Sequence, residues 1–91
     1  MRIIGEIPHP NYKISVLKAG ERVTIQIENR LLAQSFIFRD GSGVGNVSDV
    51  QKILSDAFLS RVENRFEAMH NDYIDALNNI NNSNYDDFEI I

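Results

Sequence analysis

The feature that most constrains this fold is a change in hydrophobic periodicity at residues 40–48, Asp40-Gly-Ser-Gly-Val-Gly-Asn-Val-Ser48. Before this segment, apolar and polar residues alternate, which is the pattern of half-buried β-strands. After it, apolar residues recur every three or four positions as far as Ile80, which is the pattern of one face of an α-helix. No Gly or Pro follows Gly45 to interrupt that helix. The sequence therefore predicts an α+β fold in which a short β-meander is followed by one long helix.

The residues before this change are predicted to form a three- or four-stranded antiparallel meander. The cleanest alternation lies at residues 22–28. Turns are predicted at Ala19-Gly20 and at Asn29-Arg30, because glycine and asparagine accept the left-handed backbone conformation. The last strand, over residues 31–38, is apolar on both faces. It is therefore predicted to lie centrally, unless one of its faces meets something beyond the domain.

The chain is predicted to contain one domain, over residues 1–80. Within it, strands occupy residues 2–39, a glycine-rich connector residues 40–47 and the helix residues 48–80. An extended polar and acidic tail with aromatic anchors follows over residues 81–91. Ninety-one residues without a single cysteine leave no disulfide to support so small a core. Its stability therefore has to come from that core or from a partner.

The start of the helix carries a capping box, Ser48-Asp49-Val50-Gln51. In such a box the serine hydroxyl accepts a hydrogen bond from the amide three residues on, and the glutamine side chain reaches back to the serine amide. We therefore predict that Ser48 is the N-cap. The asparagines that follow Ile80 are predicted to end the helix.

The predicted helix is longer than the predicted sheet. About 32 helical residues span about 48 Å, whereas strands of about six to eight residues span only about 20–27 Å. Either the helix breaks near Glu63 and folds back as a hairpin, or its second half packs against another chain. The absence of Gly and Pro after Gly45 favours the second alternative. The predicted interface residues on the helix are Phe66, Met69, Tyr73, Leu77 and Ile80.

The tail is predicted to supply a second contact, through Tyr85, Phe88 and Ile90. In an extended segment, Phe88 and Ile90 present one face because they are two residues apart. That arrangement suits strand addition to the edge of a neighbouring sheet.

Charge is distributed unevenly around the net value of −4. Residues 1–39 carry six basic and three acidic side chains, a net charge of +3, and residues 40–91 carry three basic and ten acidic ones, a net charge of −7. A basic sheet joined to an acidic helix suggests head-to-tail packing or an electropositive partner. The basic residues are too scattered to indicate nucleic-acid binding.

The apolar run at residues 1–6 is too short for a signal peptide, and no apolar run is long enough to cross a membrane. We therefore expect a soluble protein that is not secreted and makes no membrane contact. The absence of cysteine fits a reducing compartment.

The segment Gly41–Gly45 lies between a strand and a helix start, which is the position of phosphate-binding loops. It has Asn46 where the dinucleotide fingerprint requires glycine, and it lacks the Gly-Lys-Ser/Thr of a Walker loop. We therefore predict a flexible connector and no saturable binding of nucleotides or phosphate.

Other residues match only fragments of chemical sites. Glu63, Glu67 and His70 share a helix face with the Glu-x-x-His spacing of carboxylate di-metal bundles, but those sites need four helices. His9 stands between two prolines without an acidic or serine neighbour in sequence, which favours a rigid bend. The serines lack the glycine-flanked turn of a hydrolase nucleophile. We therefore predict no catalytic residue, no metal site and no cofactor, in a protein that is not an enzyme.

The segment Ile4-Gly-Glu-Ile-Pro-His-Pro-Asn-Tyr-Lys-Ile-Ser-Val16 resembles the start of short proteins encoded by gut anaerobes and their tailed phages. The similarity extends through the strands to Phe66-Glu-Ala-Met-His70 and ends before Asn81. This resemblance implies a context and carries over no functional residue. The expected function is that of a structural or assembly protein, an auxiliary component of a phage virion, found in the particle or in the host cytoplasm before assembly. The alternative is a small cytoplasmic homodimeric adaptor or regulator.

Overall fold

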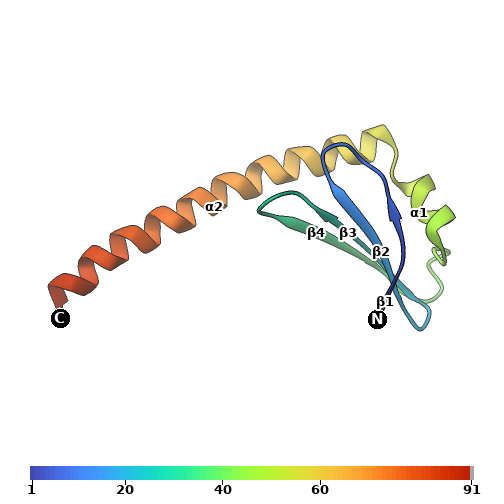
Figure 1. The fold of residues 1–91 in the computed structure, drawn as a ribbon, viewed down its shortest axis with the longest axis horizontal. Helices are drawn as coiled ribbons and strands as arrows, with labels where there is room; N and C mark the ends of the chain where they lie inside the picture. Colours follow the sequence, from blue (N-terminus) through green and yellow to red (C-terminus); the bar gives the residue numbers. More distant parts are fainter. Residues whose placement is uncertain (91) are drawn as a thin grey trace.

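The predicted strands form one antiparallel sheet whose spatial order is the order of the sequence, β1-β2-β3-β4 (Figure 1). In the computed structural model of the chain, they span Arg2–Ile7, Lys13–Ala19, Arg22–Glu28 and Ala33–Phe38. Two helices follow, α1 at Val47–Ile53 and α2 at Asp56–Ile90. The structure describes the backbone of residues 1–90 and the side chains of residues 1–81. The predicted α+β architecture, with a meander before a long C-terminal helix, is confirmed.

Both predicted hairpin turns are present, but they are held differently. Gly20 has a φ of 60°, the left-handed conformation that favours glycine. Asn29 does not adopt that conformation, so this part of the prediction is wrong. Instead, its side-chain oxygen accepts hydrogen bonds from the amides of Leu31 and Leu32, at 3.0 and 2.8 Å. Asn29 therefore fixes the turn through its side chain.

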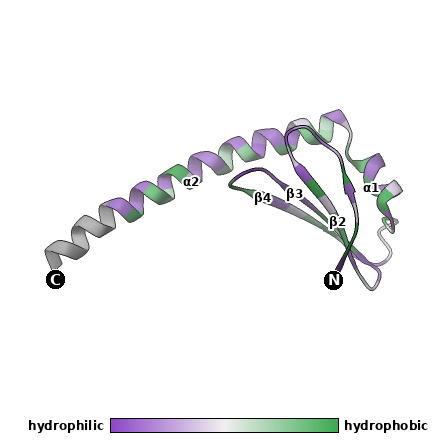
Figure 2. Cartoon of the chain, in the orientation of Figure 1, coloured by the Kyte–Doolittle hydropathy of each residue, from purple (hydrophilic) through white to green (hydrophobic). Residues whose placement is uncertain are grey.

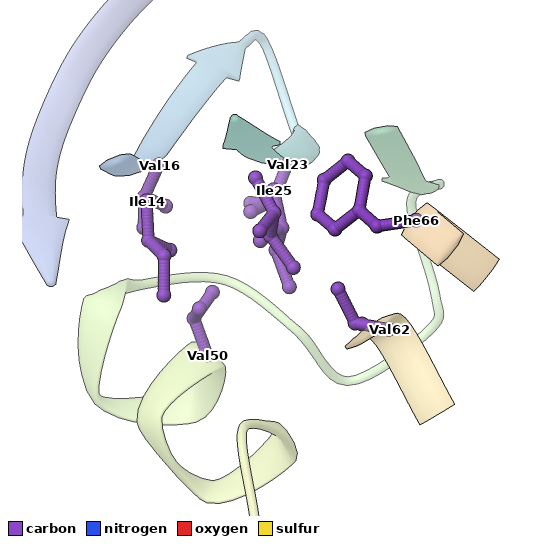
Figure 3. Close-up of a cluster of buried hydrophobic side chains, with 8 residues drawn as sticks. Ile14, Val16, Val23, Ile25, Val50, Val62 and Phe66 are labelled. Atoms are coloured by element: carbon purple, nitrogen blue, oxygen red, sulfur yellow. The ribbon is translucent and has the colours of Figure 1, made fainter. Parts of the chain in front are cut away.

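One face of the sheet is buried under the two helices. Ile14 on β2 pairs with Ile27 on β3, and Val16 pairs with Ile25, so these four side chains point to the same face. Figure 3 shows side chains of α1 and α2 pointing onto these strands. The buried core consists of Ile14, Val16, Val23, Ile25, Ile27, Val50, Val62 and Phe66.

The prediction that the last strand lies centrally is wrong. β4 pairs only with β3 and is an edge of the sheet. Its Phe36 and Phe38 pack against the core, whereas Ile37 points to the opposite face and is 58% exposed. The second alternative, that one face of this strand meets something beyond the domain, stays open.

The single helix predicted over residues 48–80 is two helices, separated at Leu54 and Ser55. The backbone carbonyl of Ser55 accepts from the Leu59 amide, and its hydroxyl accepts from the Phe58 amide at 3.2 Å. Ser55 therefore caps α2 and starts a new helix without any Gly or Pro. The alternative break near Glu63 is also wrong, because α2 is continuous there.

The predicted cap at Ser48 is wrong as well. The N-cap of α1 is Asn46, whose side-chain oxygen accepts a hydrogen bond from the Asp49 amide at 2.9 Å. Ser48 lies inside the first turn and is exposed. Asparagine is as good an N-cap as serine, and it stands two residues earlier.

Asn46→Ala is therefore expected to lower the free energy of unfolding by about 0.5–2 kcal/mol, because the Asp49 amide loses its partner. Ser48→Ala is the matched control, and it should change that free energy by less than about 0.5 kcal/mol. Urea denaturation followed by circular dichroism measures both. A larger loss for Ser48→Ala than for Asn46→Ala would contradict this assignment of the cap.

The far end of α2 also differs from the prediction. Its backbone continues through the asparagines to Ile90, where an extended tail over residues 81–91 was predicted. Asparagine lowers helix propensity, but it keeps the backbone amide that the i to i−4 hydrogen bond requires. Only proline would remove that donor, and none is present there.

Candidate protein interface

The apolar face of α2 is divided between the core and solvent. Near the start of the helix, Val62 is fully buried, Phe66 is 5% exposed, and Met69 packs partly buried against them. Farther along the same face, Leu77 is 43% exposed and Ile80 57% exposed. Figure 2 shows apolar residues continuing along α2 after the helix has left the sheet. We call the half-buried or exposed residues Tyr73, Ile74, Leu77 and Ile80 the distal stripe.

Two of the predicted interface residues thus belong to the domain itself. Phe66 is a core residue, and Met69 is packed against that core. Tyr12 lies over Phe66 with ring centroids 5.4 Å apart, and His9 stacks on the other side of Tyr12 at 4.9 Å. Burial, and secondarily the charge of Glu63, raise the pKa of Tyr12. His9 therefore completes an aromatic stack at the end of the core.

The direction of α2 is fixed by contacts with the edge strand β4. Gln34 donates from its side-chain nitrogen to the Val62 carbonyl at 2.9 Å, and its side-chain oxygen accepts from Arg65 Nε at 3.0 Å. The Arg65 guanidinium lies 5.6 Å from the ring centroid of Phe36, which in turn contacts Phe58 at 5.2 Å. A cation over an aromatic ring adds a favourable electrostatic contact. The first turns of α2 are therefore fixed against β4, and this contact sets the direction in which the rest of the helix, with the distal stripe, extends away from the sheet (Figure 1).

One exposed apolar residue outside the helix lies near His70, one helical turn before the distal stripe. Leu31, in the β3–β4 turn, is 55% exposed and lines a shallow hollow together with His70 of α2. This hollow marks the point where α2 leaves the sheet. Sequence reasoning placed Leu31 in the last strand and missed it as a surface residue of the turn.

The charge of this part of the helix has one sign. Between residues 66 and 81, α2 carries Glu67, Asp72 and Asp75 and no Lys or Arg. A surface that combines exposed apolar side chains with acidic ones favours an apolar partner with a basic rim.

The predicted contacts of Tyr85, Phe88 and Ile90 concern side chains that lie outside the described residues. Their role stays a prediction.

The glycine-rich connector is occupied by the chain's own groups. Asp49 accepts from the Gly45 amide at 2.9 Å through its carboxylate, and Lys18 donates from Nζ to the Gly45 carbonyl at 3.2 Å. A carboxylate therefore stands at the amide that an anion would need.

The Glu-x-x-His fragment gives no metal site in the part of the chain whose side chains are described. Glu63, Glu67 and His70 are all exposed, and no group of three or more acidic or histidine side chains among the described residues could hold a metal ion.

Within the described residues, neither helix has a stretch that is long and apolar enough to cross a membrane.

Comparisons with protein-family models, with curated proteins and with solved structures gave no match.

Proposed function

We propose that this chain is a non-enzymatic structural or assembly protein that acts through protein contacts made by the distal stripe of α2. The observation that carries the proposal is that one helix face is buried in the core at Phe66 and remains exposed at Leu77 and Ile80. A fully buried leucine or isoleucine side chain contributes about 1.5–3 kcal/mol, and that stabilisation is obtained here only on association.

The resemblance of the N-terminal segment to proteins of gut anaerobes and their tailed phages supports our proposal that the chain is an auxiliary component of a virion. In that role, the folded sheet with α1 and the first turns of α2 anchors the helix, and the distal stripe engages another subunit. A virion component is present in purified particles in fixed proportion to the other structural proteins. Quantitative mass spectrometry of such particles tests this placement, and a chain found only in the cell lysate would support the adaptor or regulator instead.

The contact itself is tested by charge substitution on the distal stripe. Leu77→Asp combined with Ile80→Asp should abolish association with other subunits, because two carboxylates would have to be desolvated at the contact. The matched control is Asn78→Asp combined with Asn81→Asp, which adds the same charge to the same helical turn at exposed polar positions. Native mass spectrometry and co-sedimentation with assembled particles measure association. If the control loses as much binding as the stripe variant, net charge and not the apolar face is responsible.

A further inference from the structure

Seven large apolar side chains of the described residues are substantially exposed, and they fall into two surfaces. Ile74, Leu77 and Ile80 belong to the distal stripe, and Leu31 lines a hollow with His70, one helical turn before it. The other three are Met1, which precedes β1 and is 68% exposed, and Ile3 and Ile37 of the sheet, each 58% exposed. The sheet therefore presents a second apolar surface, on the face that α1 and α2 do not cover.

The strand register places this second surface in one row. Ile3 on β1 pairs with Leu17 on β2, Leu17 pairs with Thr24 on β3, and Thr24 pairs with Ile37 on β4. Side chains of directly paired residues lie on the same face of a sheet. The four residues thus cross the whole sheet as a continuous row, which we call the open-face row.

The middle of the open-face row consists of Leu17, which is half-buried, and Thr24, which is buried. Thr24 is only 7% exposed, although no helix lies over it. Its hydroxyl oxygen is buried and has no hydrogen-bond partner among the described residues. Isolated apolar residues on a surface are common, whereas an apolar row that crosses all four strands is a candidate contact surface.

The dimensions of the two apolar surfaces agree. Three inter-strand spacings make the open-face row about 14 Å long. The distal stripe rises about 11 Å from Tyr73 to Ile80, on a helix about 10 Å wide. One helix of this kind therefore fits on the open face, as α2 already fits on the covered face.

The distribution of charge also favours contact between the distal stripe and the open-face row. The end of the sheet carries four basic and two acidic side chains, whereas α2 carries three acidic and no basic ones between residues 66 and 81. Arg2 and Lys18 are in register with the core residue Val23 and lie on the covered face, so the exposed Arg22 and Arg39 are the basic residues beside the open-face row. The charged residues at this end of the sheet are Arg2, Lys18, Arg22, Arg39, Glu21 and Asp40. Side-by-side pairing of two distal helices would bring acidic segments together, which is unfavourable.

We propose that the open-face row is the docking site for the distal stripe of a second copy of this chain, so that copies associate head to tail. This inference rests on the proposed function and names the subunit that the distal stripe engages. Because the two contacting surfaces are different, each copy keeps one surface free after the first contact. Such a heterologous contact continues into a ring or a filament instead of stopping at a dimer.

A complementation experiment tests the proposal. Ile37→Asp removes the docking site and Leu77→Asp removes the docking helix, and each variant alone should be monomeric when analysed by native mass spectrometry and analytical ultracentrifugation. An equimolar mixture of the two should form a one-to-one heterodimer and nothing larger, because each variant retains the surface that the other lacks. Asn64→Asp and Asn78→Asp, at exposed helix positions, are the charge controls and should associate like the wild type. Thermal unfolding checks that every variant is folded, and Ile3→Asp replaces Ile37→Asp if the latter is not.

The outcomes separate this proposal from the function on which it rests. If Leu77→Asp is monomeric while Ile37→Asp associates like the wild type, the distal stripe is still an interface but pairs elsewhere, and head-to-tail docking is wrong. Two monomeric variants that fail to combine would also overturn it, as would a wild-type chain that stays monomeric over the whole concentration series. Added salt gives an independent readout, since it should weaken docking of an acidic helix on a basic surface and strengthen pairing of two acidic helices.

Discussion

Phe66→Ala is expected to lower the free energy of unfolding by about 3–5 kcal/mol, the range found when a buried aromatic side chain is truncated. Phe66 is 5% exposed, contacts Tyr12 and belongs to the buried core, so its removal leaves a cavity in that core. For a domain of this size that loss is a large fraction of the total stability.

The matched control lies on the same helix face. Leu77→Ala should change the free energy of unfolding by less than about 0.5 kcal/mol, because Leu77 makes its contacts only after association. Urea denaturation at low protein concentration measures both variants in the monomer. Comparable losses for the two would mean that the distal stripe folds back onto its own domain, and the interface would then have to be abandoned.

The sequence predicted the sheet because the alternation of apolar and polar residues is a local signal. It could not place β4 at an edge, since a strand that is apolar on both faces reads the same at the centre of a sheet and at an edge with one face exposed. The exposure of Ile37 follows from the position of both helices on the other face, and that is a tertiary property.

The break between α1 and α2 was not predicted, although the spacing of the apolar residues contains a signal for it. Val50, Leu54, Phe58 and Val62 recur at intervals of four residues. At about 100° per residue, three such steps turn a straight helix by about 120° away from its starting face. Val50 and Val62 are nevertheless both fully buried over the same sheet. One straight helix would present Val50 and Val62 on different parts of its surface, and the break at Leu54 and Ser55 lets both side chains point onto the sheet.

The candidate interface was predicted in part. The sequence showed that the apolar stripe outlasts the sheet, but not where the core ends, because Phe66 and Leu77 look alike in a periodic pattern. The open-face row was not predicted at all. Ile3, Leu17 and Ile37 are far apart in the sequence, and only the strand register, with its bulge in β1 between Ile3 and Gly5, brings them into one row.

The charge distribution in the sequence suggested how two copies could pack, but not which residues would form the contact. The excess of basic residues before residue 40 and of acidic residues after it suggested head-to-tail packing from the sequence alone. The structure assigns positions to those charges, and it separates Lys18, which already bonds the connector, from the exposed Arg22 and Arg39. The head-to-tail contact itself remains the proposal that the complementation experiment tests.

Gly5→Ala is expected to lower the free energy of unfolding by about 1–3 kcal/mol, because it overpacks the contact between β1 and α1. A Cβ at this position would lie 2.7 Å from Cγ2 of Val47, the first residue of α1. The backbone of Gly5 does not have the positive φ that would itself strain an alanine, so the close contact is the whole reason for the cost.

The rescue variant makes this prediction specific. Val47→Ala removes both γ-carbons and should by itself be mildly destabilising, because Val47 is half-buried. In the double variant, the new alanine methyl occupies the space that the valine has vacated. The double variant should therefore be more stable than the sum of the single losses predicts, by a coupling of about 0.5–3 kcal/mol, as expected for residues in contact. Urea denaturation of the wild type and the three variants gives this coupling directly. Strictly additive losses would show that α1 does not rest on β1 through these two residues, and the position of α1 over the sheet would then need another explanation.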